Sequence, residues 1–346
     1  NDIQIIEGDA GSVNAVLTVT QSAYSGLPTS FQFDTVDVTA VGGADYTSVV
    51  AGAGTIPAGY LTTTVTVPVL GDVIYEGPET FNVVLSAPVN ATIADDTGVV
   101  TIIDNDPVPR ITITANPNPV LEANGNQTVS YTISLSNPSA FPVSFDWATA
   151  NITASDTHDY AASSGSLVVP ANVLTMIGFI TVDVYDDALF DLPTETYALN
   201  LTNIVGADIP NSETSEIVSI IDNDPAPFLN LATGAVTAVE GTNLVFIAQL
   251  TTDAAGTTPT AVGTDIVFVM NSSDGVTVPV ARLSQPDYTD VDGTLYTIVG
   301  DGVATSIPVI IPAIDDLLPE YTENVTAFLS LPTGSLISLG SAAVRE

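Results

Sequence analysis

Carboxylates are the main chemically active groups of this chain. Its 346 residues include 40 Asp and Glu against 3 Lys and Arg, and the net charge at pH 7 is -37. The carboxylates recur at fixed spacing: Asp-Asn-Asp at residues 104–106 returns at residues 222–224, and Glu122 and Glu240 each follow a triplet by 16 residues. Because the chain has almost no internal cations, cations are favoured partners, while nucleic acids and anionic membrane surfaces are disfavoured.

Missing residue types exclude several other kinds of chemistry. The chain has no Cys, so it has no disulfide, thiolate nucleophile or zinc–sulfur site, and its three basic residues are all Arg, which excludes lysine Schiff bases. His158 has no Ser or Cys partner pattern, and the protease-like triplet at residues 96–98 occurs once, at an expected turn. No apolar run reaches the roughly 18–20 residues of a membrane span. We therefore predict a non-enzymatic protein without membrane insertion.

Internal repeats predict the domain organisation. Ile-Ile-Asp-Asn-Asp-Pro-Val-Pro at residues 102–109 returns almost unchanged at residues 220–227, and the pair Asp45-Tyr46 is matched by Asp159-Tyr160 and Asp287-Tyr288. Repeats of this kind indicate tandem copies of one folding unit. We predict three domains, called units 1, 2 and 3, at residues 1–106, 107–224 and 225–346, with an insertion in unit 3 at about residues 271–286.

The apolar pattern within each unit has a period of two residues. Val129, Tyr131, Ile133 and Leu135, for example, alternate with polar residues. This period is typical of half-buried strands, and about seven short strands per roughly 110 residues are typical of an antiparallel sandwich. We expect an all-β chain of three tandem immunoglobulin-like sandwiches in an elongated rod, joined by proline-rich linkers that limit bending.

Four motifs of unit 1 carry a family resemblance. They are Glu-Gly-Asp-x-Gly at residues 7–11, Gly-x-Asp-Tyr at residues 43–46, Glu-x-x-Glu-Thr-Phe at residues 76–81 and Val-Thr-Ile-Ile-Asp-Asn-Asp at residues 100–106. With these motifs the chain resembles the Calx-β domain, first described in sodium/calcium exchangers and common in bacterial surface proteins. The resemblance covers essentially the whole chain and becomes less specific in units 2 and 3.

The resemblance implies Ca²⁺ sites at one end of the sandwiches. Ca²⁺ takes six to eight hard oxygen ligands, which clustered loop carboxylates can supply. Glu79, Glu195 and Glu323 lie nearer a strand start and rank below the other carboxylates as ligands. The weakest site is expected in unit 3, which has no terminal Asp-x-Asp. The matching residues are Glu7, Asp45, Asp72, Glu76, Asp104 and Asp106 in unit 1; Glu122, Asp159, Asp186, Asp187, Asp191, Asp222 and Asp224 in unit 2; and Glu240, Asp287, Asp315, Asp316 and Glu320 in unit 3.

These carboxylates also have a purely structural interpretation. Asp and Asn favour turns because their side chains bond the local backbone, so the acidic loops could be solvated turns. Five or six carboxylates at one end of a sandwich, here called its acidic pole, would repel one another without a lysine to neutralise them. A bound divalent ion removes that repulsion. We therefore expect Ca²⁺ as the cofactor.

The ends of the repeat pattern leave two interpretations open. Unit 1 has six residues before Glu7, where unit 2 has about sixteen before Glu122, and unit 3 stops within its expected closing strand. The chain is then an excerpt of a longer array, or its ends are completed by strands of neighbouring chains.

The expected function is that of an extracellular or cell-surface rod with a structural or adhesive role. Its expected partners are Ca²⁺, copies of itself or further repeats end to end, and a surface glycan or protein ligand. The alternative is a Ca²⁺-sensing regulatory module of a larger surface or transport protein. Such a sensor would respond near micromolar Ca²⁺, whereas a rod would be saturated at millimolar Ca²⁺.

Overall fold

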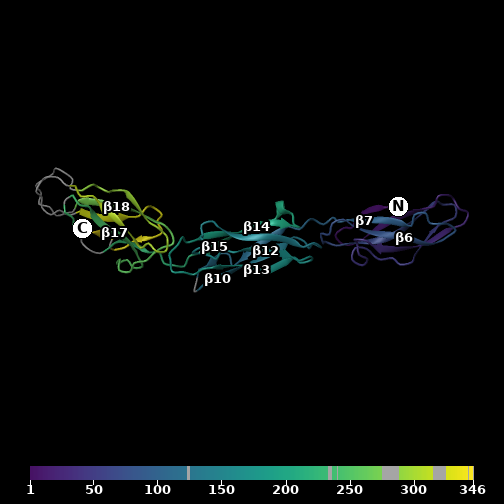
Figure 1. Ribbon diagram of the computed structural model, residues 1–346, viewed down its shortest axis with the longest axis horizontal. Helices are drawn as coiled ribbons and strands as arrows, with labels where there is room; N and C mark the ends of the chain where they lie inside the picture. The colour runs from purple at the N-terminus through teal and green to yellow at the C-terminus, as the bar shows by residue number, and fades with distance from the viewer. Residues whose placement is uncertain are drawn as a thin grey trace.

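Three β-sandwiches follow one another along the chain. The computed structural model describes residues 1–122, 125–232, 236–239, 241–274, 288–314, 325–341 and 343–345. Figure 1 shows three bodies in a row along the long axis, with the N-terminus in the body at one end and the C-terminus in the body at the other. Within the described residues the only helical element is the short 3₁₀ turn η1 (Ile209–Asn211). The prediction of an all-β rod of tandem sandwiches is confirmed.

Unit 1 is built from the first seven strands. One sheet has the order β1-β7-β6-β3-β4, and the second consists of β2 and β5. The strands are β1 (Ile3–Ile6), β2 (Gly11–Thr20), β3 (Thr29–Asp37), β4 (Gly52–Ile56), β5 (Thr62–Gly71), β6 (Glu79–Val89) and β7 (Thr97–Ile103).

Unit 2 repeats this plan with one more strand. Its sheets have the orders β13-β10-β8 and β12-β11-β14-β15-β9. The strands are β8 (Ile111–Asn116), β9 (Val120–Leu121), β10 (Gln127–Leu135), β11 (Val143–Asn151), β12 (Ser164–Val169), β13 (Thr175–Val184), β14 (Glu195–Val205) and β15 (Ser215–Ile221).

Unit 3 has two sheets of four strands, in the orders β20-β17-β16-β22 and β19-β18-β21-β23. The predicted insertion begins inside β18, and residues 275–287 lie outside the described residues. The strands are β16 (Phe228–Leu231), β17 (Leu244–Thr251), β18 (Ile266–Asp274), β19 (Thr294–Ile298), β20 (Ser306–Ile311), β21 (Val325–Ser330), β22 (Ser338–Leu339) and β23 (Val344–Arg345).

Each unit encloses its own hydrophobic core. The alternating residues Val129, Tyr131, Ile133 and Leu135 of β10 are all buried, while their polar neighbours are more exposed. The period of two therefore has the predicted cause, since successive side chains of a strand point to opposite faces of the sheet. The three cores share no residue, and one residue of unit 2, Phe190, contributes to the core of unit 3.

A parallel strand pair brings distant acidic segments to one pole. In unit 1, β1 runs parallel to β7, with Ile6 opposite Ile103, so Glu7 and the triplet at residues 104–106 leave the sheet side by side. In unit 2, β9 and β15 repeat the arrangement, with Leu121 opposite Ile221. The sheet topology therefore places a glutamate beside each Asp-Asn-Asp triplet.

Candidate metal centres

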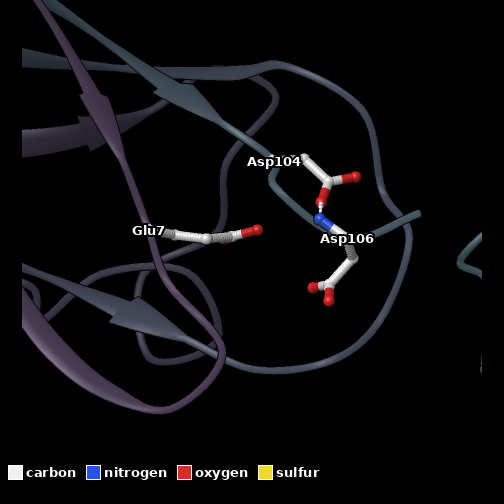
Figure 2. A group of neighbouring side chains, drawn as sticks. All are labelled: Glu7, Asp104 and Asp106. Carbon is white, nitrogen blue, oxygen red and sulfur yellow. Dashed lines mark hydrogen bonds between the residues drawn. The ribbon is translucent and has the colours of Figure 1, made fainter.

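The first acidic cluster of unit 1 consists of Glu7, Asp104 and Asp106. Figure 2 shows the Glu7 carboxylate, at the end of β1, pointing toward the loop that carries both aspartates. One oxygen from each residue lies within 4.8 Å of the others, and Glu7 is only 4% exposed. The Gly8 N–H donates to Asn105 Oδ1 at 2.8 Å and ties the two segments together. Three carboxylates thus converge on one point at the pole.

Hydrogen bonds satisfy only part of this cluster. Asp104 Oδ2 accepts the N–H groups of Glu76 at 2.8 Å and Gly77 at 2.7 Å, so Asp104 holds the neighbouring loop in place. Glu7 Oε1 and Asp106 Oδ2, in contrast, are buried without any hydrogen-bond partner. A buried carboxylate oxygen without a partner is costly unless a cation or a proton satisfies it. The cluster therefore fits a hard, oxygen-seeking cation.

A second cluster of unit 1 combines Asp45, Glu76 and Glu79, again with one oxygen of each within 4.8 Å of the others. Asp45 is buried and accepts the Val41 N–H at 2.6 Å, which fixes its orientation. Sequence reasoning ranked Glu79 below the other carboxylates because it begins β6, yet the structure places it beside Asp45. The available signal was its recurrence, since Glu195 and Glu323 occupy the same place in the other repeats.

Unit 2 repeats the first cluster with Glu122, Asp222 and Asp224, whose ligand oxygens also lie within 4.8 Å of one another. Glu122 is buried, and Asp224 Oδ2 is buried without a hydrogen-bond partner. Asp222 Oδ2 accepts the Asp191 N–H at 3.0 Å, which repeats the way in which Asp104 holds its loop in unit 1. The first acidic clusters of units 1 and 2 therefore have the same arrangement of carboxylates and supporting hydrogen bonds.

Asp159, Asp191 and Glu195 of unit 2 occupy the repeat positions of Asp45, Glu76 and Glu79, and they lie close enough for their charges to act on one another. Asp159 and Asp191 are both buried. Burial raises the pKa of Glu195 to about 8, and the negative charges of Asp159 and Asp191 and a side-chain hydrogen bond with Asp159 add to this increase. Asp159 Oδ2 accepts the Ser155 N–H at 2.5 Å, as Asp45 accepts that of Val41. The paired arrangement of Asp159 and Glu195 thus follows that of Asp45 and Glu79.

Three further predicted ligands lie outside the compact clusters. Asp72 Oδ1 accepts the Ile74 N–H at 2.7 Å, and Asp187 Oδ1 accepts the Leu189 N–H at 2.7 Å, so each closes the turn that the structural interpretation expected. Asp186 Oδ2 accepts the Gly125 N–H at 2.5 Å. Asp72 and Asp187 nevertheless act on the clusters by charge, because they raise the pKa of Glu7 and Glu122, respectively.

The pKa values show how unfavourable these carboxylates are as free anions. Burial, and then the negative charge of neighbouring carboxylates, raises the pKa of Glu7 and of Glu122 to about 8. The same causes, in the same order, raise the pKa of Glu76, Glu79 and Asp191 to about 7. Positive charge placed among these groups would reverse the effect. The poles are therefore suited to bind cations.

The predicted ligands of unit 3 are five carboxylates. Glu240, Asp287, Asp315, Asp316 and Glu320 all lie outside the described residues.

The acidic ends of units 1 and 2 each contact the next unit. In the first junction, the Tyr75 N–H donates to Pro138 O at 3.0 Å and the Ala140 N–H donates to Tyr75 O at 2.9 Å. The Tyr75 and Phe141 rings meet edge to face, with centroids 6.1 Å apart. In the second junction, Phe190 forms the equivalent parallel bridge with Val262 and is buried in the core of unit 3. Each docking residue lies one position before an acidic ligand candidate.

The other chemical signals of the sequence correspond to turns and loops. Asp96 precedes β7 and accepts the Thr97 hydroxyl at 2.8 Å, as expected of a turn residue. The His158 ring lies beside Thr157, with its Nδ1 3.1 Å from the Thr157 hydroxyl oxygen, as expected of a loop histidine. No helix in the described part of the chain has the length and apolar character needed to cross a bilayer.

Comparison with known proteins gives one family match. The family model described as the Calx-beta domain matches residues 2–107 and 104–224. Adhesion G-protein coupled receptor V1 of Danio rerio is 27% identical over 186 residues, which are 54% of this chain and 3% of the receptor.

Two solved structures are distant likenesses. The structure of calcium binding domain CBD12 of CALX1.1 is 19% identical, with a TM-score of 0.28, over 59% of this chain and 78% of its own. The apo-form Calx CBD1 domain is 22% identical, with a TM-score of 0.27, over 33% of this chain and 99% of its own.

Proposed function

The chain belongs to the Calx-beta domain family, and from this premise we propose that it is a non-enzymatic, Ca²⁺-stabilised rod with a structural or adhesive role outside the cell. The main observation behind the proposal is that one loop both carries ligand candidates and contacts the next unit. Residues 72–77 contain Asp72 and Glu76 and also contain Tyr75, which bonds to the next unit. Residues 187–191 have the same double use at the second junction.

Two groups of Ca²⁺ ligands are proposed for each of units 1 and 2. The first groups carry the buried oxygens without partners at Glu7, Asp106 and Asp224. The ligand types support Ca²⁺ because all are carboxylates, without sulfur or imidazole. Bound Ca²⁺ supplies the positive charge that the poles lack. The first groups are Glu7, Asp104 and Asp106 in unit 1 and Glu122, Asp222 and Asp224 in unit 2; the second groups are Asp45, Glu76 and Glu79 in unit 1 and Asp159, Asp191 and Glu195 in unit 2, with Asp72, Asp186 and Asp187 at their margins.

Stiffening of the junctions follows from these contacts. Without cations, repulsion among the carboxylates displaces the loop at residues 72–77, which holds Tyr75 against unit 2. With the charge neutralised, Asp104 keeps its bonds to the Glu76 and Gly77 N–H groups, and Tyr75 stays against residues 138–140. The pole, the loop and the next sandwich then form one body. A chain of such bodies holds a binding surface at a distance from its anchor, or links with others.

The composition supports an extracellular location. Modules that bind Ca²⁺ at millimolar levels suit extracellular fluid, where weak sites remain filled. The chain also offers only 3 Lys and Arg residues to trypsin-like proteases. The adhesive partner is proposed only by class, as a surface glycan or protein.

Small-angle scattering of the full chain tests the proposal. We expect a longer, narrower distance distribution in millimolar Ca²⁺ and a broader one after a chelator is added, with bending at residues 107–109 and 225–227. The same concentration of Mg²⁺ serves as the control for ionic strength. Scattering curves that do not change between Ca²⁺ and chelator contradict the stiffening mechanism.

The junction contacts also favour a second candidate function. A loop that binds an ion and a neighbouring domain can transmit ion occupancy, as a Ca²⁺-sensing module of a larger protein would require. A sensor switches its scattering curve at micromolar Ca²⁺, whereas a rod changes only as Ca²⁺ falls below the millimolar range. The Ca²⁺ concentration at half-change therefore distinguishes the two functions.

A further inference from the structure

The middle residue of each Asp-Asn-Asp triplet differs in chemistry from its two neighbours. The aspartates of both triplets contribute oxygens to the first acidic clusters. Asn105 and Asn223 stand between them, and both are exposed and uncharged. An amide offers a donor as well as an acceptor, so asparagine forms hydrogen bonds that an ionised carboxylate cannot form.

In unit 1, the Asn105 amide is bonded to the two residues that follow Glu7. Asn105 Oδ1 accepts the Gly8 N–H at 2.8 Å, and Asn105 Nδ2 donates to Asp9 Oδ1 at 2.5 Å. The donor and the acceptor of this amide are therefore both used to hold the segment at residues 7–9 against the triplet.

In unit 2, Asn223 holds the equivalent segment through a different bond. Asn223 Nδ2 donates to the backbone carbonyl oxygen of Glu122 itself. Residues 123 and 124, which match Gly8 and Asp9, lie outside the described residues. The two asparagines thus share one target, the segment that carries the buried glutamate, although their individual bonds differ.

Strand pairing ends just before these glutamates. In unit 1 the last paired residues are Ile6 and Ile103, and the Glu7 N–H donates to Ile103 O at 3.3 Å. In unit 2 the Glu122 N–H donates to Ile221 O at 3.0 Å. The asparagine bonds lie beyond this point and continue the connection between the two segments, where the glutamate carboxylates must be held in place.

The turn of the triplet is formed by a different side chain. Asp104 Oδ1 accepts the Asp106 N–H at 2.7 Å, a bond drawn in Figure 2, and Asp222 Oδ1 accepts the Asp224 N–H at 2.7 Å. An aspartate that bonds the backbone two residues later closes such a turn by itself. The turn and the placement of the glutamate can therefore be separated by substitution.

We propose that Asn105 and Asn223 are positioning residues of the first Ca²⁺ groups, acting through Glu7 and Glu122 without touching the ion. Each amide fixes the glutamate segment on the triplet before the ion binds, so less conformational freedom is lost on binding. This inference rests on the proposed Ca²⁺-stabilised rod and deepens it, because it assigns a role at the site to two residues that are not among the carboxylate ligands.

Asn105→Ala and Asn223→Ala remove the amides without changing the net charge. The full chain is titrated with Ca²⁺, and protection from hydrogen exchange is followed in peptides of each unit. The Ca²⁺ concentration at half-protection should rise about fivefold or more in the substituted unit, because one or two hydrogen bonds that hold a ligand are lost. It should stay within about twofold in the other unit, which serves as an internal control.

Asn90→Ala is the matched control for the loss of an asparagine hydrogen bond. Asn90 Nδ2 donates to Pro28 O at 3.0 Å, as Asn223 donates to the carbonyl oxygen of Glu122, but Asn90 lies in the turn between β6 and β7, at the end of unit 1 away from the triplet. This variant is expected to leave half-protection within about twofold in both units. Thermal melts in chelator establish that every variant is folded, and if one alanine variant does not fold, the other decides the outcome.

A double-mutant cycle tests whether Asn105 acts through Glu7. In the Glu7→Gln background, Asn105→Ala is expected to change half-protection in unit 1 by no more than about twofold, because the ligand that the amide positions is already lost. A merely structural role would lower the melting temperature in chelator and leave half-protection unchanged.

Two results overturn the inference while leaving the proposed function intact. They are unchanged half-protection in the alanine variants, and a loss in the Glu7→Gln background as large as in the unsubstituted chain, which would mean that Asn105 acts independently of Glu7. Absence of Ca²⁺-dependent protection in the unsubstituted chain would overturn the proposed function and this inference with it, so the two failures are distinguishable.

Discussion

The carboxylate of Asp191 lies directly against the backbone of Gly263, across the junction between units 2 and 3. A Cβ atom at position 263 would stand 2.0 Å from Asp191 Oδ1 and 2.4 Å from Oδ2. The Gly263 N–H also donates to Phe190 O at 3.1 Å, as Ala140 does to Tyr75 at the first junction. A proposed Ca²⁺ ligand of unit 2 is therefore packed against unit 3.

Gly263→Ala is expected to weaken Ca²⁺ binding by unit 2 by about tenfold, because the methyl group must displace the Asp191 carboxylate. Isothermal titration of the full chain with Ca²⁺ measures the change, and hydrogen exchange shows that unit 1 is unaffected. Gly26→Ala is the matched control, since no atom lies within 4 Å of a Cβ placed there. Unchanged Ca²⁺ affinity in Gly263→Ala would disprove the coupling of this ligand to the junction.

Glu7→Gln and Glu122→Gln are expected to have opposite effects with and without Ca²⁺. In chelator above about pH 8, where Glu7 and Glu122 are ionised, each substitution removes a buried negative charge from a repulsive cluster, so the free energy of unfolding should stay equal or rise. In Ca²⁺, each substitution removes a ligand. A site at a hundredfold excess of Ca²⁺ over its Kd adds about 2.7 kcal/mol to the free energy of unfolding, and most of this stabilisation should be lost. Thermal melts in both conditions measure the two effects. Glu213→Gln, at an exposed position, is the control; equal destabilisation in both conditions would indicate a structural role alone.

Glu79→Gln tests the carboxylate that sequence reasoning ranked below the others. Because Glu79 lies with Asp45 and Glu76, its loss should weaken one Ca²⁺ site of unit 1 and leave the site of Glu7, Asp104 and Asp106 filled. Equilibrium dialysis with ⁴⁵Ca²⁺ should then count about one ion fewer per chain at intermediate Ca²⁺. An unchanged ion count at every Ca²⁺ concentration would remove Glu79 from the ligands.

The pH dependence of stability follows from the raised pKa values. The pKa of Glu7 and Glu122 is about 8 in the folded chain, against an ordinary value of 4.5. Between these values the folded state binds more protons than the unfolded state, so the free energy of unfolding falls as pH rises. In chelator, the melting temperature should therefore fall from about pH 5 to about pH 8.

Ca²⁺ should change this profile. It binds the deprotonated carboxylates, so the gap between melting curves in Ca²⁺ and in chelator should widen over the same pH range. Differential scanning calorimetry across pH measures both trends. A melting temperature that rises in chelator up to about pH 8 would contradict the raised pKa values.

The sequence predicted the architecture because its signals are local and repeated. The period of two in β10 reflects the pleat of a strand, and the Asp-Asn-Asp triplets mark the end of the closing strand in units 1 and 2. Glu7 could be placed beside its triplet because the family pattern contains both motifs. These features need no knowledge of side-chain rotamers or domain contacts.

Features that depend on packing between distant segments were not predictable in this way. The approach of Asp191 to Gly263 depends on how two sandwiches dock, and neither residue alone indicates it. The position of Glu79 beside Asp45 depends on the pairing of β6 with its neighbours.

A thermal melt of the full chain at fixed concentration, in millimolar Ca²⁺ and then in excess chelator, tests the central claim most directly. Each site held at a hundredfold excess over its Kd should add about 2.7 kcal/mol to the free energy of unfolding, so the melting temperature should rise clearly in Ca²⁺. Mg²⁺ at the same concentration should give a smaller rise. Superimposable curves in Ca²⁺ and chelator would contradict the account and leave the acidic poles as solvated turns.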